Sequence, residues 1–408
     1  MDRTTVCVVG GGPAGMVLGL LLSRAGVEVT VLEKHADFLR DFRGDTVHPP
    51  TLDLLDDLGL GEEFAKIPQR RIDAVSLPFQ GRVVQIGDLS RLKGRHPYIA
   101  MVPQWDFLDL LKRAGDAEPA FSLRMETEAT GLLREGGKVV GVAYRTRDGR
   151  TGEIRADLTV AADGRSSVLR AAAGLTPKSW ATPMDVWWFR LPRHESDPGG
   201  VIGNITERRA AVMIDRGEYW QCAVLIGKGT DAAARTGDVG DIVRQLGVGA
   251  PWLLDRVDAL ADWDEVKVLD VKLDRLPRWH VDGLLCIGDA AHAMSPVGGV
   301  GINLAVQDAI ATAGLLAAPL RAGGATGADL ARVRRRRLPA TAVIQGVQRL
   351  AHWGAIGPAV RGEVRVADSD KLPLPVRLLN RFPRLRGYPA FVLGRGVRSE
   401  PTPAFARR

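Results

Sequence analysis

The chain has 408 residues, of which 45% are hydrophobic and 25% charged, values that exclude a disordered chain, a collagen and a disulfide scaffold. At roughly 150 residues per domain, this length predicts two to three domains. The net charge is +7, but basic and acidic residues are mixed along most of the chain, and only residues 332–337 form a dense basic run. We interpret the charge as a solvated surface and expect no nucleic-acid partner.

A glycine-rich turn follows the first predicted strand. Residues 6–9 are apolar, residues 10–15 read Gly-Gly-Gly-Pro-Ala-Gly, and an apolar helix is expected over 16–25. Gly10 permits the tight turn, Gly12 lets the backbone approach a pyrophosphate, and Gly15 lets helix and strand pack closely. The turn and the helix N-terminus therefore predict a nucleotide-binding site, with Pro13 and Ala14 among its contacts.

An acidic residue supports the same interpretation. Glu33 ends the next predicted strand, residues 27–32, and lies 33 − 10 = 23 residues after Gly10. This spacing is typical of an acid that binds ribose hydroxyls, and a carboxylate there would repel a 2′-phosphate. The segment, including the neighbouring Lys34, predicts FAD or NAD rather than NADP at this site.

The middle of the chain, residues 71–99 and 178–273, is mainly strand-like. Aromatic walls stack on flat substrates, so large side chains here are candidates for lining a pocket. Strand alternation puts Trp187 and Phe189 on one face and Trp188 on the other, and the sequence leaves open which face meets the pocket. The predicted lining residues are Trp187, Phe189, Met213 and Tyr219, with Trp220 as a further candidate.

A second strand–turn–helix unit contains an Asp-Gly pair. Residues 158–162 are apolar, and Asp163-Gly164 follows them before serines that suit a helix start. Taken alone, the Asp-Gly pair indicates an ordinary type I turn rather than a binding motif.

A third such unit lies much later in the chain. The apolar residues 284–287 end in Gly288-Asp289, and a glycine loop then opens an Ala-rich helix over 304–317. Asp289 can accept hydrogen bonds from polyol hydroxyls. The loop, residues 298–301, leaves room for a flat ring against its backbone. The N–H groups of Ile302 and Asn303 would point from the helix start toward a developing anion.

The three cysteines, Cys7, Cys222 and Cys286, lie in apolar runs without metal-binding or redox spacing. We expect buried thiols in a reducing compartment and no metal site. The N-terminus has no signal-like region, and no apolar run reaches the roughly 18 residues of a membrane span. These observations predict a cytoplasmic protein with no integral membrane segment, either a monomer or a dimer.

Three motifs in this order resemble the FAD-dependent aromatic hydroxylases of the para-hydroxybenzoate hydroxylase fold, the single-component flavoprotein monooxygenases. The motifs are the Gly-x-Gly-x-x-Gly of residues 10–15, Asp163-Gly164-x-x-Ser167-x-x-Arg170, and Gly288-Asp289. The resemblance spans about residues 4–350. It implies an α/β fold in which a Rossmann-type FAD-binding domain is interleaved with a mainly β substrate domain and followed by a helical C-terminal region.

The resemblance also implies domain boundaries. The FAD-binding domain would comprise residues 1–70, 100–177 and 274–350, and the β-sheet substrate domain residues 71–99 and 178–273. Residues 351–408 would form a helical, Pro-rich and basic C-terminal segment.

Several site residues are assigned by the resemblance. Glu33 would bind the adenosine ribose, Asp289 the ribityl or pyrophosphate region, and Gln104 the ribityl chain. Asp163 and Arg170 would support FAD and a transiently bound NADH or NADPH. The expected cofactor contacts are Gly10, Gly12, Pro13, Ala14, Gly15, Glu33, Lys34, Arg43, Gln104, Asp163, Arg170, Gly288, Asp289, Pro296, Gly299, Gly301, Ile302 and Asn303.

Three residues are candidates for a role at the flavin itself. Arg43 matches a family arginine at the mouth of a mobile-flavin channel, and Pro296 begins the loop that would hold the ring. His48, next to Asp45, is either an acid, base or substrate hydrogen-bond donor, or a loop histidine held by backbone. His292 is expected to anchor its loop structurally.

The reaction implied by the resemblance is hydroxylation of an aromatic or other electron-rich small molecule. The family uses NAD(P)H to reduce FAD and transfers one oxygen atom from a flavin C4a-hydroperoxide, and the expected setting here is natural-product tailoring. A prenyl-lipid or quinone-ring oxidoreductase of the same superfamily is the nearest alternative. A flavin-dependent halogenase is disfavoured because Trp187-Trp188 does not fit its Trp-x-Trp-x-Ile signature, and a non-enzymatic flavin sensor is the remaining alternative.

Overall fold

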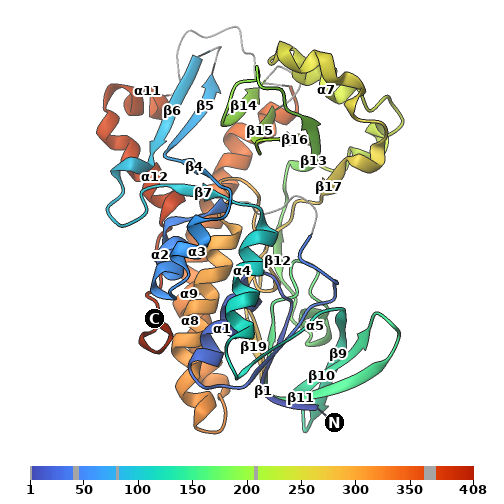
Figure 1. Cartoon of the computed structure of the whole chain (residues 1–408), viewed down its shortest axis with the longest axis vertical. Coiled ribbons are helices and arrows are strands. Elements are labelled where there is room, and N and C mark those ends of the chain that lie inside the picture. Colours follow the sequence, from blue (N-terminus) through green and yellow to red (C-terminus); the bar gives the residue numbers. More distant parts are fainter. Residues whose placement is uncertain (1, 40–45, 80–81, 206–209, 363–373) are drawn as a thin grey trace.

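The computed structural model describes residues 2–39, 46–79, 82–205, 210–362 and 374–408. It confirms the predicted fold class, an α/β nucleotide-binding part joined to a mainly antiparallel part (Figure 1). In Figure 1 the nucleotide-binding part occupies the lower half, and two β structures form the upper half.

The central sheet joins strands that are far apart in the sequence. Its order is β19-β20-β11-β1-β2-β8, and β1 lies between two parallel neighbours, β11 and β2. The hairpin β9–β10 extends it from β11. The strands are β1 (Asp2–Val9), β2 (Val29–Leu32), β8 (Phe121–Arg124), β9 (Thr127–Glu135), β10 (Lys138–Thr146), β11 (Thr151–Ala161), β19 (His280–Val281) and β20 (Leu284–Cys286).

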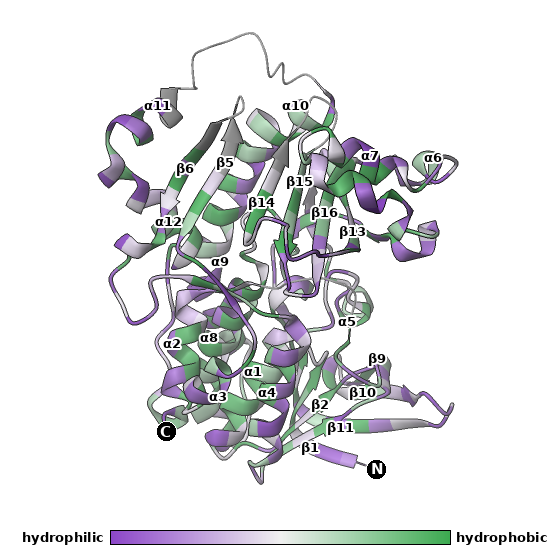
Figure 2. Ribbon diagram, turned by 45° about the horizontal axis from the view of Figure 1, so that its top comes forward, coloured by the Kyte–Doolittle hydropathy of each residue, from purple (hydrophilic) through white to green (hydrophobic). Residues whose placement is uncertain are grey.

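Helices α1 (Pro13–Arg24), α4 (Gln104–Asp116) and α8 (Gly301–Arg321) pack together beside this sheet, and α1 and α8 are apolar. Helix α1 is buried along almost its whole length, because it packs against α4 and α8. Helix α9 (Gly327–Ala351) runs beside α8, so the two form a long pair at the centre of the molecule. Figure 2 shows the hydrophobic character of α1 and α8.

Helix α8 corrects one expectation from the sequence. Its 21 residues are long and apolar enough by composition to cross a membrane, although no such run was expected. In this structure 72% of its most apolar stretch is buried inside the protein, and its buried residues include the charged Asp308. Both features are typical of the core helix of a globular fold.

The second large sheet is antiparallel, in the order β14-β15-β16-β13-β17. One of its faces is covered by α7 (Asp241–Gly247) and the 3-10 segment Pro251–Ala259, which share a hydrophobic core with it. The strands are β13 (Met184–Pro192), β14 (Val201–Ile205), β15 (Ala210–Asp215), β16 (Tyr219–Gly227) and β17 (Lys267–Leu269).

Short elements complete the fold. Three small sheets pair β3 (Thr46–Val47) and β4 (Arg70–Ile72) with β7 (Ile99–Met101), β5 (Ala74–Phe79) with β6 (Arg82–Asp88), and β12 (Lys178–Trp180) with β18 (Leu273–Arg275). The remaining α-helices are α2 (Pro49–Asp57), α3 (Gly61–Ala65), α5 (Val168–Ala172), α6 (Asp231–Ala234), α10 (Gly357–Val360), α11 (Leu374–Arg381) and α12 (Gly387–Gly394).

The C-terminal residues return to the nucleotide-binding part. Arg24 donates to the carbonyl of Ala406, and the backbone N–H of Arg408 donates to the carbonyl of Asp57. These last residues are therefore packed against the first helices of the chain, while α11 and α12 pack against β6.

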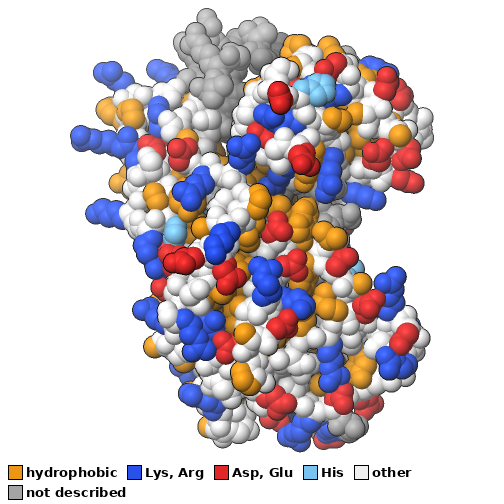
Figure 3. Space-filling view, in the orientation of Figure 1, with side chains coloured by type: hydrophobic (Ala, Val, Ile, Leu, Met, Phe, Trp, Pro, Cys, Tyr) orange, Lys and Arg blue, Asp and Glu red, His pale blue; other side chains and the backbone are white. Residues whose placement is uncertain are grey.

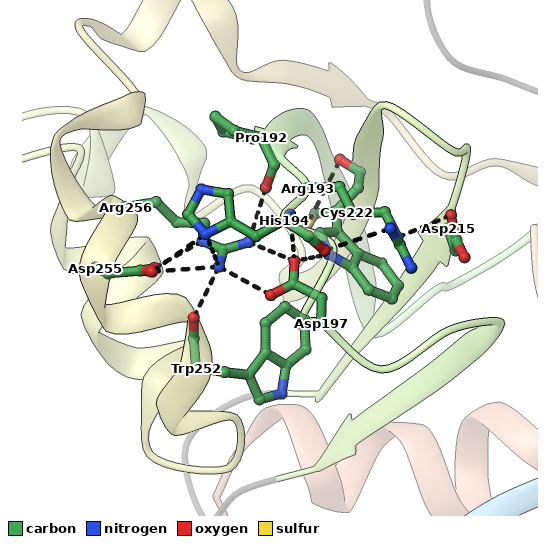
Figure 4. Close-up of polar contacts among 10 residues, drawn as sticks. Pro192, Arg193, His194, Asp197, Asp215, Cys222, Trp252, Asp255 and Arg256 are labelled. Atoms are coloured by element: carbon green, nitrogen blue, oxygen red, sulfur yellow. Dashed lines mark hydrogen bonds and ion pairs between the residues drawn. The ribbon is translucent and has the colours of Figure 1, made fainter.

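A buried ion pair joins the second sheet to its helical cover (Figure 4). The guanidinium of Arg256 lies 2.6 Å and 3.0 Å from the two carboxylate oxygens of Asp197, and both residues are buried. The indole of Trp220 and the backbone N–H of His194 donate to the same carboxylate. The guanidinium and these donors outweigh burial and hold the pKa of Asp197 well below its ordinary value.

We expect Asp197→Ala to lower the free energy of unfolding by about 3 kcal/mol, because it leaves Arg256 charged and buried without its partner. Denaturation followed by tryptophan fluorescence measures the change. Asp255→Asn is the matched control, since Asp255 also pairs with Arg256 but is mostly exposed, and it should cost less than about 1 kcal/mol.

The wild-type contribution should also depend on pH. Because the folded-state pKa of Asp197 lies below its unfolded value, the stabilisation is present at neutral pH. It should be lost as the pH falls below about 4, where the unfolded carboxyl begins to bind its proton. Equal losses in the two variants would contradict this account.

Candidate functional site

The three glycine-containing motifs meet at one edge of the central sheet. Strands β20, β11, β1 and β2 are parallel neighbours, so their carboxyl ends lie side by side. A Cβ atom added to Gly10 would lie 2.3 Å from the carbonyl oxygen of Ala162, and one added to Gly288 would lie 3.3 Å from Cβ of Ala14. Ligands of open α/β sheets bind at this kind of crevice, where connections diverge on either side of a strand.

The turn after β1 leaves space for a ligand. Gly10 has φ +110°, and a Cβ on Gly15 would lie 1.9 Å from the carbonyl oxygen of Gly10, so both positions require glycine. A Cβ on Gly12, in contrast, would meet nothing within 4 Å. Helix α1 begins there without a side-chain cap, and its N-terminal dipole suits a phosphate.

Glu33 ends β2 beside this turn and is almost fully buried. Its carboxylate accepts a 2.8 Å hydrogen bond from the backbone N–H of Gly11 and lies 2.6 Å from Nδ1 of His35. The next residue, Lys34, is exposed. The protein thus holds an oriented carboxylate next to the glycine turn, as a ribose-binding acid requires.

The Asp-Gly motif is tied to the Gly-Asp motif. Asp163 accepts hydrogen bonds from Oγ of Ser167 at 2.5 Å and from the backbone N–H of Leu169, so it caps the start of α5, and burial raises its pKa. Arg170 donates to the carbonyl of Ala290. Arg165 bridges the motifs from the other side, with its guanidinium 3.1 Å from the half-exposed carboxylate of Asp289.

A buried charge network lies beneath Gly288. The carboxylate of Asp308 is 2.6 Å from Nε2 of His292 and 3.0 Å from Nε of Arg337, and it accepts a hydrogen bond from the backbone N–H of Gly288. Burial alone would raise the pKa of Asp308, but these partners lower it. Arg337 also pairs with Glu400. His292 is therefore an anchoring residue, as predicted, while Arg337 is a core residue despite its place in a basic run.

The loop predicted to hold a flat ring is a tight turn. The backbone N–H of Gly299 donates to the carbonyl of Pro296, and Gly298 has φ +83°, as the third residue of a type II turn requires. Helix α8 then begins at Gly301 without a side-chain cap, and a Cβ at Gly301 would meet nothing within 4 Å. This is a second empty space beside a helix N-terminus.

His48 contacts the backbone of this loop. Its ring is fully buried, with Nδ1 2.9 Å from the carbonyl oxygen of Leu393 and Nε2 3.1 Å from that of Gly299. Burial lowers its pKa, so the ring is neutral at pH 7 and donates to only one carbonyl. The hydroxyl of Thr46 also donates to Gly299. In this structure His48 positions the loop and has no open access to a substrate.

Three residues of α9 and the turn after it also hold the loop, and sequence reasoning missed them. The amide of Gln348 donates to the carbonyls of Ser295 and Val297, and Nε2 of His352 lies 2.8 Å from Oγ of Ser295. Gln345 donates to the carbonyl of Ala293. The signal was present as the polar residues 345, 348 and 352, whose spacing of three and four puts them on one face of a helix.

Most of the predicted pocket-lining residues lie on the other face of their sheet. Trp187, Phe189 and Met213 are at most 1% exposed and belong to the core beneath α7. Trp220 lies in the same core. They do not line an open pocket, because strand alternation points them toward the helical cover.

The opposite face of this sheet meets the ring loop. A small apolar cluster on this face contains Val186 and Ala223, and Trp188, Leu225 and Val297 of the loop all pack against it. Ile356 and Val360, which follow α9, pack against the same cluster. Tyr219 lies on this face, half-buried, with the guanidinium of Arg190 4.5 Å from its ring centre. Figure 3 shows hydrophobic side chains gathered at the waist between the upper and lower parts of the molecule.

The remaining predicted contacts are placed as follows. Gln104 is the first residue of α4 and half-buried, and Asn303 turns its side chain toward Thr51, whose hydroxyl donates to it at 3.2 Å. Ile302 lies in the first turn of α8. Arg43 and Asp45 lie outside the described residues. Among the residues that the structure does describe, no cluster of metal-ligating side chains is found.

The residues present fit FAD. Both uncapped helix starts, at Gly12 and at Gly301, have no atom within 4 Å of an added Cβ, and the second lies beside the turn of residues 296–299. Comparison with known families agrees, because residues 3–346 match the model of the FAD binding domain.

Similar proteins were found in sequence and in structure. The chain is 35% identical to 6-methylpretetramide 4-monooxygenase of Streptomyces rimosus, with 88% of this chain and 87% of that protein covered. It is 26% identical to protoasukamycin 4-monooxygenase of Streptomyces nodosus subsp. asukaensis, covering 88% and 91%. The solved anhydrotetracycline hydroxylase OxyS of Streptomyces rimosus shares the fold, with a TM-score of 0.74, 24% identity and coverage of 96% and 76%.

We expect Gly12→Val to lower the affinity for FAD at least tenfold while leaving the stability of the apoprotein nearly unchanged. The new side chain enters space that is empty without ligand but would obstruct a pyrophosphate. FAD binding to apoprotein, followed by flavin fluorescence, measures the affinity. Gly131→Ala is the control, because a Cβ there also meets nothing within 4 Å, and a similar loss in that variant would refute the assignment.

Proposed function

This chain belongs to the family of FAD-dependent monooxygenases that share the FAD binding domain, and on that premise we propose that it hydroxylates a fused-ring aromatic compound. FAD-dependent oxygenation with NAD(P)H and O₂ is the activity of this family. The name of its 35% identical relative, a pretetramide 4-monooxygenase, supports a polycyclic aromatic natural product as the substrate class.

One observation carries this proposal. The face of the second sheet that bears Trp188 and Leu225 packs against Val297 of the ring loop, and an apolar surface thus lies next to the expected flavin position. Flat substrates are bound by apolar and aromatic walls with few polar groups. This surface is a suitable wall for a polycyclic ring, whereas the face bearing Trp187 is filled by core packing.

The protein's own residues would bind and orient the cofactor. The N-terminus of α1 at Gly12 would hold the pyrophosphate, and Glu33 the adenosine ribose. Asp289, at the end of β20 and half-exposed, is placed for the polyol chain. Bound FAD would supply electron transfer from NAD(P)H and the activation of O₂.

The start of α8 would stabilise charge at the ring. The uncapped helix N-terminus at Gly301 is oriented toward the ring loop, and its partial positive charge favours an anion there. Gln348 fixes the loop through its backbone carbonyls and His352 through the hydroxyl of Ser295, so the ring position is set before any substrate arrives. The apolar wall at Trp188 would exclude water from the reacting centre.

We infer that the protein works in the cytoplasm. Cys7, Cys222 and Cys286 are all free and buried, and burial raises the pKa of Cys7 and Cys286 to about 12, so neither forms a reactive thiolate near neutral pH. Buried free thiols are typical of a reducing compartment. NADH and NADPH both remain possible donors.

The function is tested with a panel of polycyclic phenols, including a pretetramide. A substrate should stimulate NAD(P)H oxidation by the FAD-loaded protein, and mass spectrometry should show a product that has gained one oxygen atom. Stimulated oxidation that yields only hydrogen peroxide would count against hydroxylation of that compound. If no compound of the panel yields a product that has gained an oxygen atom, the proposed substrate class is wrong.

Neighbouring tryptophans offer a matched test of the wall. Trp188→Phe should raise KM for the polycyclic substrate several-fold, because it alters the proposed wall, with little effect on FAD binding. Trp187→Phe removes the 2.7 Å hydrogen bond from the indole to Asp231 and should lower stability by about 1 kcal/mol without changing KM. Steady-state kinetics and thermal denaturation of both variants distinguish the two faces, and the reverse pattern would overturn the assignment.

A further inference from the structure

A cluster of cations surrounds one indole ring away from the cofactor site. The guanidinium carbons of Arg275 and Arg349 each lie 5.2 Å from the ring centre of Trp180, and Nζ of Lys178 lies 5.9 Å from it. Trp180 is half-buried, while Lys178 and Arg349 are exposed. Cation–π attraction offsets only a small part of the repulsion among three like charges.

The strand register brings two of these cations together. Lys178 of β12 is directly opposite Arg275 of β18 in the antiparallel pair, an arrangement that destabilises a sheet when the charges are alike. Arg334 of α9 adds a further cation, and its Nε is buried without a hydrogen-bond partner. Burial, together with Arg334 and Arg349, lowers the pKa of Arg275.

Carboxylates do not neutralise this cluster. Across the described ranges, neither Lys178, Arg275, Arg334 nor Arg349 has a carboxylate oxygen within the 4.0 Å of an ion pair. Exposed arginines elsewhere do have such partners, as in the pairs Arg145–Glu128, Arg147–Glu126 and Arg150–Asp148. The cluster is therefore a local positive charge that an anion from outside the chain would stabilise.

The cluster is separate from the FAD site. Asp274, the residue before Arg275, accepts a 3.1 Å hydrogen bond from the backbone N–H of Ala293, in the segment that leads to the ring loop. Strand alternation then places Arg275 on the opposite side of β18. Lys178 and Arg349 are exposed, and Arg275 is half-buried between them.

We propose that Lys178, Arg275 and Arg349, grouped around Trp180, bind a phosphate group of a small soluble organic phosphate. Guanidinium groups suit phosphate because their planar N–H donors can bind two oxygens at once, and the ammonium of Lys178 adds charge. The indole of Trp180, over which all three cations lie, groups them around one position where an anion can bind. This site does not depend on the proposed hydroxylation, and either proposal can fail alone.

Adenosine 2′,5′-bisphosphate is a suitable probe, titrated by calorimetry into the FAD-loaded protein so that the cofactor site is already filled. We expect saturable binding that weakens as the salt concentration rises. Arg275→Gln and Arg349→Gln should each weaken it at least tenfold, with an unchanged flavin spectrum. Arg335→Gln is the control, because Arg335 is an exposed residue of the same helix outside the cluster, and it should change affinity less than twofold.

Vesicles of phosphatidylcholine with phosphatidylglycerol form a second arm, because Val347, Leu350 and Trp353 are exposed on the same helix. Binding to these vesicles without binding of the soluble bisphosphate would overturn the proposal in favour of membrane docking. The proposal also fails if the bisphosphate does not bind at low salt, or if Arg335→Gln weakens binding as much as the cluster variants.

Discussion

The buried carboxylate of Asp308 connects four parts of the chain that are distant in sequence. It binds the backbone of Gly288, the ring of His292 and the guanidinium of Arg337, which in turn reaches Glu400. An isolated buried charge is costly, so each partner is required for the others to be stable. The turn that would meet the cofactor is thus fixed by electrostatics from within the core.

Two layers of contacts converge on the expected flavin position. From the nucleotide-binding part, glycine backbones pack so closely at Gly10 and Gly15 that any side chain would collide with a neighbouring carbonyl. From the other side, Gln348 of α9 and the following His352 support the ring loop, and Ile356 and Val360, further along, pack against the same apolar cluster as Trp188. Cofactor loop and substrate wall therefore share one support, and a shift in α9 would move both.

Local patterns were sufficient to predict the fold class and the convergence of the three glycine motifs, because a strand, a turn and a helix are encoded within 30 residues of each other. Long-range partners could not be predicted. Arg337 sits in a basic run that is typical of a surface, yet it is buried against Asp308 and Glu400, 29 and 63 residues away. The sequence also could not predict which face of the second sheet meets the pocket. Strand alternation separates Trp187 from Trp188 but does not show which face the helices cover.

The interleaving of distant segments has a consequence for biosynthesis. Strand β1 leaves the ribosome some 150 residues before its neighbour β11, and Arg24 leaves it 382 residues before Ala406, whose carbonyl it binds. Many multidomain chains fold domain by domain as each domain leaves the ribosome. The nucleotide-binding part cannot do so, because its segments are separated in the sequence. FAD can therefore bind only after these segments have been synthesised. Until then, the apolar helix α1 has to be kept from aggregating.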